Sequence, residues 1–177
     1  VYKLFAIDPN GLDVNGEQVS AISNKELGQI SSLKNPNGFL GVFHIPKQTE
    51  NILSDWILVL DGIQDPGNLG TIIRLCDWFG VKDVVCSNTT VDCYNTKVLQ
   101  ATMDSITRVN IQYTDLQAFL STTKLPVYGT FMDGVNVNNS KLPEKGIMIM
   151  GNEGKGVSEA VAKLCTDRLA IPQFGEA

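Results

Sequence analysis

The sequence WILVLDGIQDPGNLGTIIR, residues 56–74, contains the transition that decides the fold. Its first five residues form an apolar run of strand length, followed by a loop rich in glycine, proline and asparagine. Apolar residues then return at helical spacing, so the segment predicts a buried strand, a loop and an amphipathic helix. Pro66-Gly67 is expected to break the chain, and Asn68 is expected to cap the helix.

The predicted helix has one apolar face and one exposed face. Arg74 lies off the apolar face, so its side chain can point into solvent or into a cleft. The spacing alone favours an ordinary surface arginine on a capped helix. The residues expected to pack on the sheet are Leu69, Ile72, Ile73, Cys76 and Phe79.

Two more loops follow predicted strands in the same way. The first is within IMIMGNEGKG, residues 147–156, and the second is within LAIPQFG, residues 169–175. Loops at the carboxyl ends of parallel strands build the ligand sites of open α/β sheets. Together with the loop before Arg74, they therefore predict a single shared pocket.

The glycines of residues 151–156 have the spacing G-x-x-G-x-G. This is neither the dinucleotide-binding pattern nor a phosphate-binding loop with its lysine-serine pair. Glu153 would repel a phosphate at the position where the loop could present its N–H groups. A neutral or cationic ligand fits better than a nucleotide phosphate, and the alternative is a glycine-rich turn without a ligand.

Strand and helix patterns alternate from Trp56 onward, which predicts an α/β fold with a mostly parallel sheet and helices on both faces. Residues 136–140 are polar and predict a mobile loop. The expected strands are 56–60, 81–86, 109–112, 127–131, 147–150 and 169–171. The expected helices begin after Asn68 and span about 96–104, 115–122 (with a capping box at 114–117) and 158–165.

The first part of the chain, residues 1–48, predicts a separate small α/β domain. Ser23 and Glu26 fit a capping box, with Leu27, Ile30 and Leu33 following at helical spacing. Residues 39–43 predict a buried strand, and the polar residues 47–51 predict a linker to residues 49–177. Because the chain begins inside an apolar run without an initiator Met, we expect this domain to be incomplete.

Composition limits the possible functions. The net charge of −5 argues against a broad electrostatic grip on nucleic acid, although a local basic patch stays possible. No apolar run approaches membrane-spanning length, and no leader pattern is present, so we expect a cytoplasmic protein without a membrane partner. The four cysteines lack metal-ligand spacing, which predicts buried thiols and no metal. His44 is expected to be a half-buried structural residue, not part of a catalytic triad.

The three loops resemble the three sequence motifs of the SPOUT methyltransferases, in the SpoU/TrmH branch that methylates ribose 2′-hydroxyls of tRNA or rRNA. Asn68-x-Gly70 followed by Arg74 matches the first motif, residues 151–156 match the second, and Ile171-Pro172 opens the third. Segments 91–95 and 130–134 also lie where that family has similar segments. The resemblance runs from about Ile57 to the end of the chain.

This resemblance implies a C-terminal trefoil knot, one of the rare exceptions to unknotted chains. It also implies bound S-adenosylmethionine, an RNA partner (tRNA or rRNA), a homodimer, and an N-terminal part that is the remainder of an RNA-binding domain. In the family the third motif continues into a Ser-Leu-Asn helix, which this sequence does not reach. The implied catalytic residues are Arg74 and Asn68, and the implied cofactor-binding residues are Thr130, Gly151, Asn152, Glu153, Gly156, Ile171 and Pro172.

The role of Arg74 has two interpretations. A guanidinium with a pKa above about 12 is a weak general base, so Arg74 could instead orient a phosphate and stabilise a developing alkoxide. Two other functions stay open: a non-catalytic RNA-binding dimer that keeps the knotted domain as a scaffold, and a nucleotide- or NAD-dependent enzyme. The glycine spacing and Glu153 speak against the enzyme that binds a nucleotide.

Overall fold

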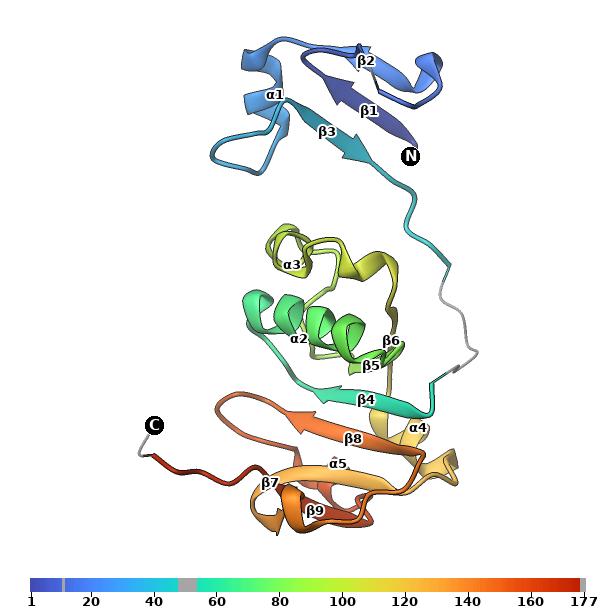
Figure 1. Ribbon diagram of the computed structural model, residues 1–177, viewed down its shortest axis with the longest axis vertical. Coiled ribbons are helices and arrows are strands. Elements are labelled where there is room, and N and C mark those ends of the chain that lie inside the picture. Colours follow the sequence, from blue (N-terminus) through green and yellow to red (C-terminus); the bar gives the residue numbers. More distant parts are fainter. Residues whose placement is uncertain (11, 48–53, 176–177) are drawn as a thin grey trace. The chain divides into compact units, whose positions relative to one another are not determined.

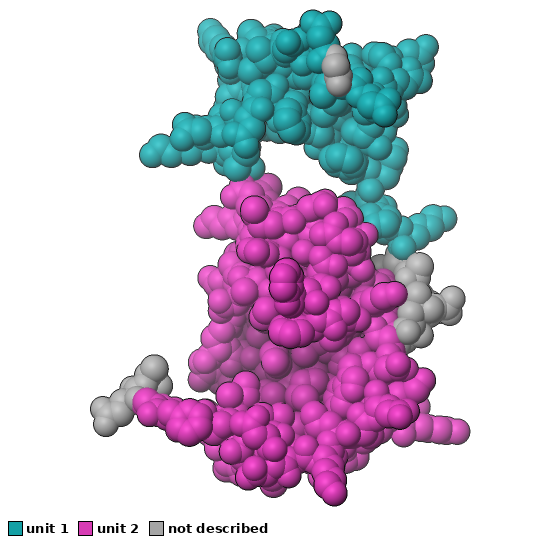
Figure 2. All heavy atoms as spheres, in the orientation of Figure 1, with its two compact units in different colours: residues 1–47 teal, residues 48–177 magenta. Residues whose placement is uncertain are grey.

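The computed structural model describes residues 1–10, 12–47 and 54–175. The chain divides into two compact units, residues 1–47 and 48–177, coloured separately in Figure 2. The predicted linker at 47–51 lies outside the described residues, except for Lys47.

The first unit is a three-stranded sheet with the strand order β2-β1-β3. Strand β1 pairs in parallel with β2 and antiparallel with β3. The predicted capping box is confirmed, because the Ser23 hydroxyl accepts the Glu26 N–H while the Glu26 carboxylate accepts the Ser23 N–H at 2.8 Å. The elements are β1 Lys3–Ala6, the 3₁₀ helix η1 Gly16–Gln18, β2 Val19–Ala21, α1 Asn24–Ile30 and β3 Phe39–Val42.

The prediction that residues 39–43 form a buried strand was correct about the strand and wrong about the burial. Phe39 is 59% exposed in β3, and Phe43, beyond the strand, is 68% exposed. The reason is that this unit buries few side chains in its interior, so an apolar strand keeps an uncovered face. The half-buried state expected for His44 is also wrong: His44 is exposed and packs edge-on against Tyr2.

The second unit contains a six-stranded sheet with the strand order β6-β5-β4-β8-β7-β9, and every strand pair in it is parallel (Figure 1). This confirms the α/β fold with a parallel sheet. The strands are β4 Trp56–Asp61, β5 Asp83–Ser87, β6 Asn110–Thr114, β7 Val127–Asn136, β8 Gly146–Gly151 and β9 Asp167–Ala170. The helices are α2 Pro66–Phe79, α3 Thr96–Thr102, η2 Ser105–Thr107, α4 Leu116–Thr122, η3 Val137–Asn139 and α5 Glu159–Ala162.

Helices cover both faces of this sheet, as predicted. Leu60 of β4 belongs to a core with residues of α2 and α3, which lie together on one side of β4 in Figure 1. Ile57 and Val59 of the same strand belong to a second core with residues of α4 and α5. Successive strand side chains point to opposite faces, so one apolar run supplies both cores.

Helix α2 begins earlier than predicted, and its cap is Asp65, not Asn68. The Asp65 carboxylate accepts the Asn68 N–H at 2.8 Å, and Pro66 occupies the first turn, where its missing N–H costs nothing. Asn68 is therefore released from capping and its side chain is available for another contact. Phe79 was wrongly expected to pack on the sheet, since it is 74% exposed.

Other boundaries also differ from the predictions. Helix α3 ends at Thr102 because Met103 and Asp104 have left-handed backbone conformations. Strand β7 continues to Asn136 through an irregularity between Thr130 and Val135, and the expected mobile loop after it contains the 3₁₀ helix η3. Within the described ranges, no helix has the length and apolarity needed to cross a membrane.

Candidate functional site

The predicted loops meet at the carboxyl ends of neighbouring strands. Strands β4 and β8 are hydrogen-bonded neighbours, and Asp61 at the end of β4 lies opposite Gly151 at the end of β8. The loops that follow them therefore lie side by side. The loop after β8 borders a hollow of about 550 Å³, hereafter the loop hollow, together with residues 130–133 and Ile171. No residue of the loop after β4 lines it, so the single pocket predicted for all three loops is formed by the second and third loops only. Its lining residues are Thr130, Phe131, Met132, Asp133, Gly151, Asn152, Glu153, Gly154, Lys155, Gly156, Val157 and Ile171.

The loop after β8 is a tight backbone structure that requires glycine. Asn152 and Gly156 exchange two backbone hydrogen bonds of 3.0 and 2.9 Å, which fold the loop onto itself. A Cβ atom at Gly151 would lie 2.1 Å from the Gly156 carbonyl carbon and the Val157 nitrogen. Gly156 has φ of +70°, a conformation that other residues rarely adopt. The shape of this wall is thus set by main chain.

Asn152 fixes the loop with its side-chain amide. Its Oδ1 accepts the N–H groups of Gly154 and Lys155, both at 3.0 Å. Its Nδ2 donates to the Gly62 carbonyl in the loop after β4 at 2.7 Å. One side chain therefore shapes its own loop and joins it to the neighbouring one.

Asn68 and Glu153 make the second link between these loops. The Asn68 Nδ2 donates to the Glu153 Oε1 at 3.0 Å, across 85 residues of sequence. This hydrogen bond, followed by smaller contributions from the N–H groups of residues 153, 64 and 65, lowers the pKa of the Glu153 carboxyl. Glu153 is therefore a carboxylate at neutral pH, and it directs negative charge to the side of the loop hollow nearest α2.

Strand β7 provides the opposite wall. The Thr130 hydroxyl donates to the Ile149 carbonyl at 2.9 Å, which ties β7 to β8 at the edge of the hollow. Beyond Thr130 the chain bulges, and Arg168 of β9 lies over the Phe131 ring at 3.5 Å while pairing with Asp133 at 2.6 Å. The sequence does not predict these contacts, because the pairing of residue 168 with residues 131–133 depends on which strands become neighbours.

The third loop contributes less than the first two. Ile171 borders the loop hollow and is 73% exposed, while Pro172 follows it outside the set of lining residues. The exposed cation Lys155, which is not one of the predicted site residues, also borders the hollow. No local pattern distinguishes Lys155 from an ordinary loop lysine.

Arg74 lies apart from this group. It is exposed on α2, six residues and thus about 9 Å along the helix axis from Asn68. It lines a different hollow of about 610 Å³ between α2 and the turn after α3, hereafter the helix hollow. The structure therefore joins Asn68 to the predicted cofactor residues but gives Arg74 separate surroundings.

Other candidate chemistry is sparse in the described part of the chain. His44 belongs to the first unit. Among the residues that the structure describes, no group of three or more His, Cys, Asp or Glu side chains could hold a metal ion. Cys76, Cys86 and Cys93 are buried in the core beside α2, where burial raises the pKa of each thiol. They pack as small apolar side chains, as the sequence predicted, whereas Cys165, also expected to be buried, is only partly buried.

These features define a class of protein: a parallel α/β fold whose ligand hollow is formed by main-chain loops at the carboxyl ends of adjacent strands. The profile of the SpoU rRNA methylase family matches residues 55–177. The chain therefore belongs to the SpoU rRNA methylase family of methyltransferases, as its sequence motifs predicted.

Two relatives illustrate the similarity in sequence. The chain is 30% identical over 173 residues to the 23S rRNA (guanosine(2553)-2′-O)-methyltransferase RlmP of Bacillus subtilis, covering 96% of this chain and 69% of that protein. It is 31% identical over 138 residues to the 23S rRNA (guanosine-2′-O-)-methyltransferase RlmB of Neisseria meningitidis, covering 75% of this chain and 55% of that protein.

Solved structures have the same fold. A protein from Porphyromonas gingivalis, described as an RNA methyltransferase of the TrmH family, is 33% identical with a TM-score of 0.90, covering 99% of this chain and 74% of that one. The SpoU methyltransferase AviRb of Streptomyces viridochromogenes, solved with AdoMet, has a TM-score of 0.81 at 19% identity, covering 99% of this chain and 75% of that one. The second likeness concerns the fold alone.

Proposed function

We propose that this protein transfers the methyl group of S-adenosylmethionine to a ribose 2′-hydroxyl of RNA, in tRNA or rRNA. The observation that carries the proposal is the Asn68–Glu153 hydrogen bond, which joins the first family motif to the second, at a residue that lines the loop hollow. Membership of the SpoU family and the names of the two rRNA-modifying relatives support the same reaction. The enzyme then acts where its RNA is located, which we propose is the cytoplasm.

The residues around the loop hollow fit S-adenosylmethionine better than a nucleotide phosphate. Gly151 lets the loop fold back on itself, and the open space at Gly156 allows close approach by a flat adenosine group, with Thr130, Ile171 and the adjoining Pro172 beside it. The Glu153 carboxylate complements a cationic sulfonium, and Lys155 complements the methionine carboxylate. Asn152 keeps the loop in this shape. The bound cofactor supplies an electrophilic methyl group.

The chain's own residues must position and activate the ribose oxygen. A hydroxyl is a poor nucleophile while it is protonated, so the site must align it and favour loss of its proton. Arg74 is exposed, and within the described residues it makes no ion pair, so its guanidinium is available to bind RNA. We assign it to hold a phosphate beside the target ribose and to stabilise the developing alkoxide. Asn68, held by Glu153, positions the edge of the site nearest Arg74.

A homodimer is part of the proposal. Leu75 is 51% exposed and Phe79 is 74% exposed on α2, and they border a wholly apolar hollow of about 320 Å³. Trp56, Met148 and Met150 line the same hollow from the sheet. An apolar patch of this kind on a soluble fold is typical of a protein interface. We propose that a second copy joins here by a two-fold axis, and that the loop hollow of one copy and Arg74 of the other form one active site.

The trefoil knot and the role of the first unit are also proposals. The loop hollow is bordered by both the β8 loop and Ile171 of the third motif, as expected if the chain after β9 threads beneath that loop. We assign residues 1–48 to an RNA-binding domain and residues 49–177 to the methyltransferase domain.

The alternative function is an RNA-binding dimer that does not catalyse methyl transfer. The same fold would serve as its scaffold, and the net charge of −5 is compatible with a protein that binds a limited RNA site. The Asn68–Glu153 contact speaks against this alternative, since a scaffold has no need for two exposed polar side chains that join the first and second motifs.

The deciding experiment measures tritium transfer from labelled S-adenosylmethionine to unmodified transcripts of tRNA and 23S rRNA. Nuclease digestion should then yield a 2′-O-methylated nucleoside. Calorimetry on the same protein should detect binding of S-adenosylmethionine and negligible binding of NAD. RNA binding without methyl transfer would favour the scaffold, and a methylated base would show that the proposed reaction is wrong.

A further inference from the structure

The helix hollow contains two large exposed side chains that the proposed reaction leaves without a role. Trp78 on α2 is 84% exposed, and Met103 in the turn after α3 is 69% exposed. Both line the helix hollow with Arg74. Arg74 and Trp78 are four residues apart on α2, so they lie one turn apart on one helix face. An indole, a thioether and a guanidinium thus border the same space.

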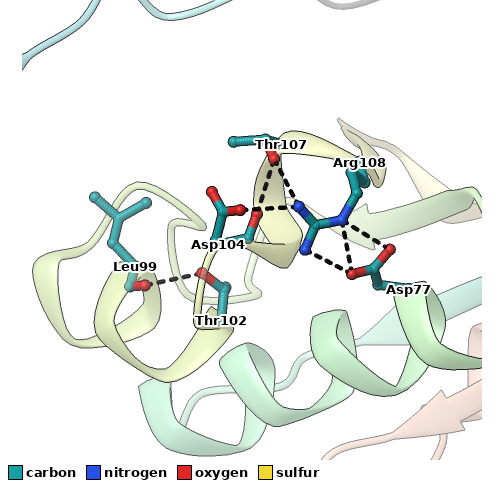
Figure 3. Close-up of polar contacts among 6 residues, drawn as sticks. All are labelled: Asp77, Leu99, Thr102, Asp104, Thr107 and Arg108. Carbon is teal, nitrogen blue, oxygen red and sulfur yellow. Dashed lines mark hydrogen bonds and ion pairs between the residues drawn. The ribbon is translucent and has the colours of Figure 1, made fainter. Parts of the chain in front are cut away.

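The turn that presents Met103 is a strained and well-fixed structure. Met103 has φ of 47° and Asp104 has φ of 79°, and these are the only non-glycine residues with positive φ in the described ranges. Such conformations are unfavourable for side-chain-bearing residues and occur disproportionately at functional sites. The Asp104 carbonyl accepts hydrogen bonds from the Thr107 hydroxyl at 2.8 Å and from the Thr107 N–H at 3.1 Å. The Thr102 hydroxyl donates to the Leu99 carbonyl at the end of α3 (Figure 3).

Arg108 attaches this turn to α2. Its guanidinium pairs with Asp77 of α2 at 2.9 Å and with Asp104 of the turn at 2.9 Å, as Figure 3 shows. The hydrogen bond from Arg108 lowers the pKa of the Asp77 carboxyl. The carboxylates of Asp77 and Asp104 are therefore both paired with Arg108. Arg74 also lines the helix hollow, and it has no ion-pair partner among the described residues.

These surroundings match a nucleotide. Bases of single-stranded RNA stack on aromatic side chains, and a guanidinium binds the adjoining phosphate. We propose that Trp78 and Met103 form a platform on which a base next to the methylated nucleotide stacks, with Arg74 on the phosphate between them. This inference rests on the proposed function and assigns Trp78 and Met103 as positioning residues for the RNA.

The observations favour RNA over a second copy of the chain at this place. The helix hollow presents polar as well as apolar surface and an unpaired cation, and the chain as a whole carries a net charge of −5. A single nucleotide satisfies both features of the hollow, because its phosphate complements the Arg74 cation while its base covers Trp78 and Met103. The neighbouring hollow beside Leu75 and Phe79 is wholly apolar and suits a subunit contact better.

The test measures steady-state methyl transfer to unmodified 23S rRNA transcript by the full chain and by Trp78→Ala. Loss of one stacked base typically costs about 1–3 kcal/mol, so the KM for RNA should rise on the order of 5- to 150-fold. The kcat and the affinity for S-adenosylmethionine should change less than about threefold, because uniform binding is lost while the reacting groups stay. Trp78→Phe should recover most of the loss, and Met103→Ala should show a smaller one.

Leu142→Ala, at an exposed apolar residue before β8, is the matched control and should leave the KM for RNA unchanged. Fluorescence anisotropy with labelled transcript measures RNA affinity without catalysis. If the wild type binds RNA but transfers no methyl group, the proposed function fails, while a weaker affinity of Trp78→Ala still supports the platform. An unchanged KM and affinity for Trp78→Ala would overturn the platform. If light scattering shows that Trp78→Ala converts a dimer to a monomer, Trp78 is a subunit contact and the proposed platform is also wrong.

Discussion

The loop hollow and the helix hollow both belong to the second unit, but they differ in the kind of atoms that line them. The first is formed mainly by main chain that glycine and asparagine force into one shape, as at Gly151 and Asn152. The second is formed by exposed side-chain ends, among them Arg74, Trp78 and Met103. A small cofactor of fixed shape needs the rigid site, whereas a large RNA can be held by a few exposed groups. The difference suggests separate sites for cofactor and substrate, which variants can test one at a time.

The largest expected effect comes from Arg74→Ala. Because Arg74 is exposed on α2, its removal should leave folding and cofactor affinity nearly unchanged. Methyl transfer should fall by about 10²–10³, the usual loss for one preorganised electrostatic contact. Arg74→Lys should recover little, since lysine keeps the charge but loses the planar fork. Single-turnover methyl transfer with saturating RNA measures this effect.

Lys163→Ala is the matched control for Arg74, because it removes an exposed cation beside α5 on the other face of the sheet. Its methyl transfer should equal that of the wild type. Near wild-type turnover by Arg74→Ala would contradict the catalytic assignment, and an equal loss in Lys163→Ala would point to general charge instead.

The loop hollow should be most sensitive at Gly151. Gly151→Ala places a Cβ atom against main chain of residues 156 and 157, so the loop must shift. Overpacking of this kind costs about 1–3 kcal/mol, which corresponds to roughly a 5- to 150-fold weaker affinity for S-adenosylmethionine. Calorimetry measures the affinity. Gly28→Ala is the control outside the site, because a Cβ atom at this glycine of the first unit meets no atom within 4 Å. Similar losses in both variants would mean that the loop shape is not what matters.

A smaller effect is expected for the contact between the two loops. Asn68→Ala and Glu153→Gln should each weaken cofactor affinity severalfold. Their double-mutant cycle should show a coupling of about 0.5–1 kcal/mol, since both side chains are exposed and solvent screens their interaction. Calorimetry on the two single variants and the double variant measures the coupling. Strict additivity would show that the 3.0 Å hydrogen bond does not join the loops energetically.

The smallest effect is the dependence of stability on pH. The pKa of Glu153 is lower in the folded protein than its ordinary value of 4.5. The stabilisation from this carboxylate should therefore be complete above about pH 4.5 and should be lost as the pH falls through the lowered pKa. Urea unfolding from pH 3 to pH 7 should show the wild type approaching Glu153→Gln in stability on acidification. A difference that grows toward acid pH would have the wrong sign for this mechanism.

Much of the fold could be predicted from local patterns. The alternation of apolar runs with helical spacing predicted the parallel α/β sheet, and the motif residues predicted the family that the profile match confirmed. The predicted roles of the cofactor residues stay predictions, as do the knot, the dimer and the domain assignment. The errors concern the cap of α2, several element boundaries and burial: Phe39 and Phe79 are apolar but exposed, because no described neighbour covers them.

The sequence by itself determined which residues form strands, where glycine must stand, and which family chemistry the loops can support, because those properties depend on residues close together in the chain. Only the tertiary structure decided that Asn68 contacts Glu153, 85 residues away, after Asp65 had taken over the cap of α2. It likewise decided that Trp78 and Met103 share a hollow with Arg74. Contacts of this kind depend on strand order and helix packing. The free energies of both are summed over the whole core, so no short stretch of sequence predicts them.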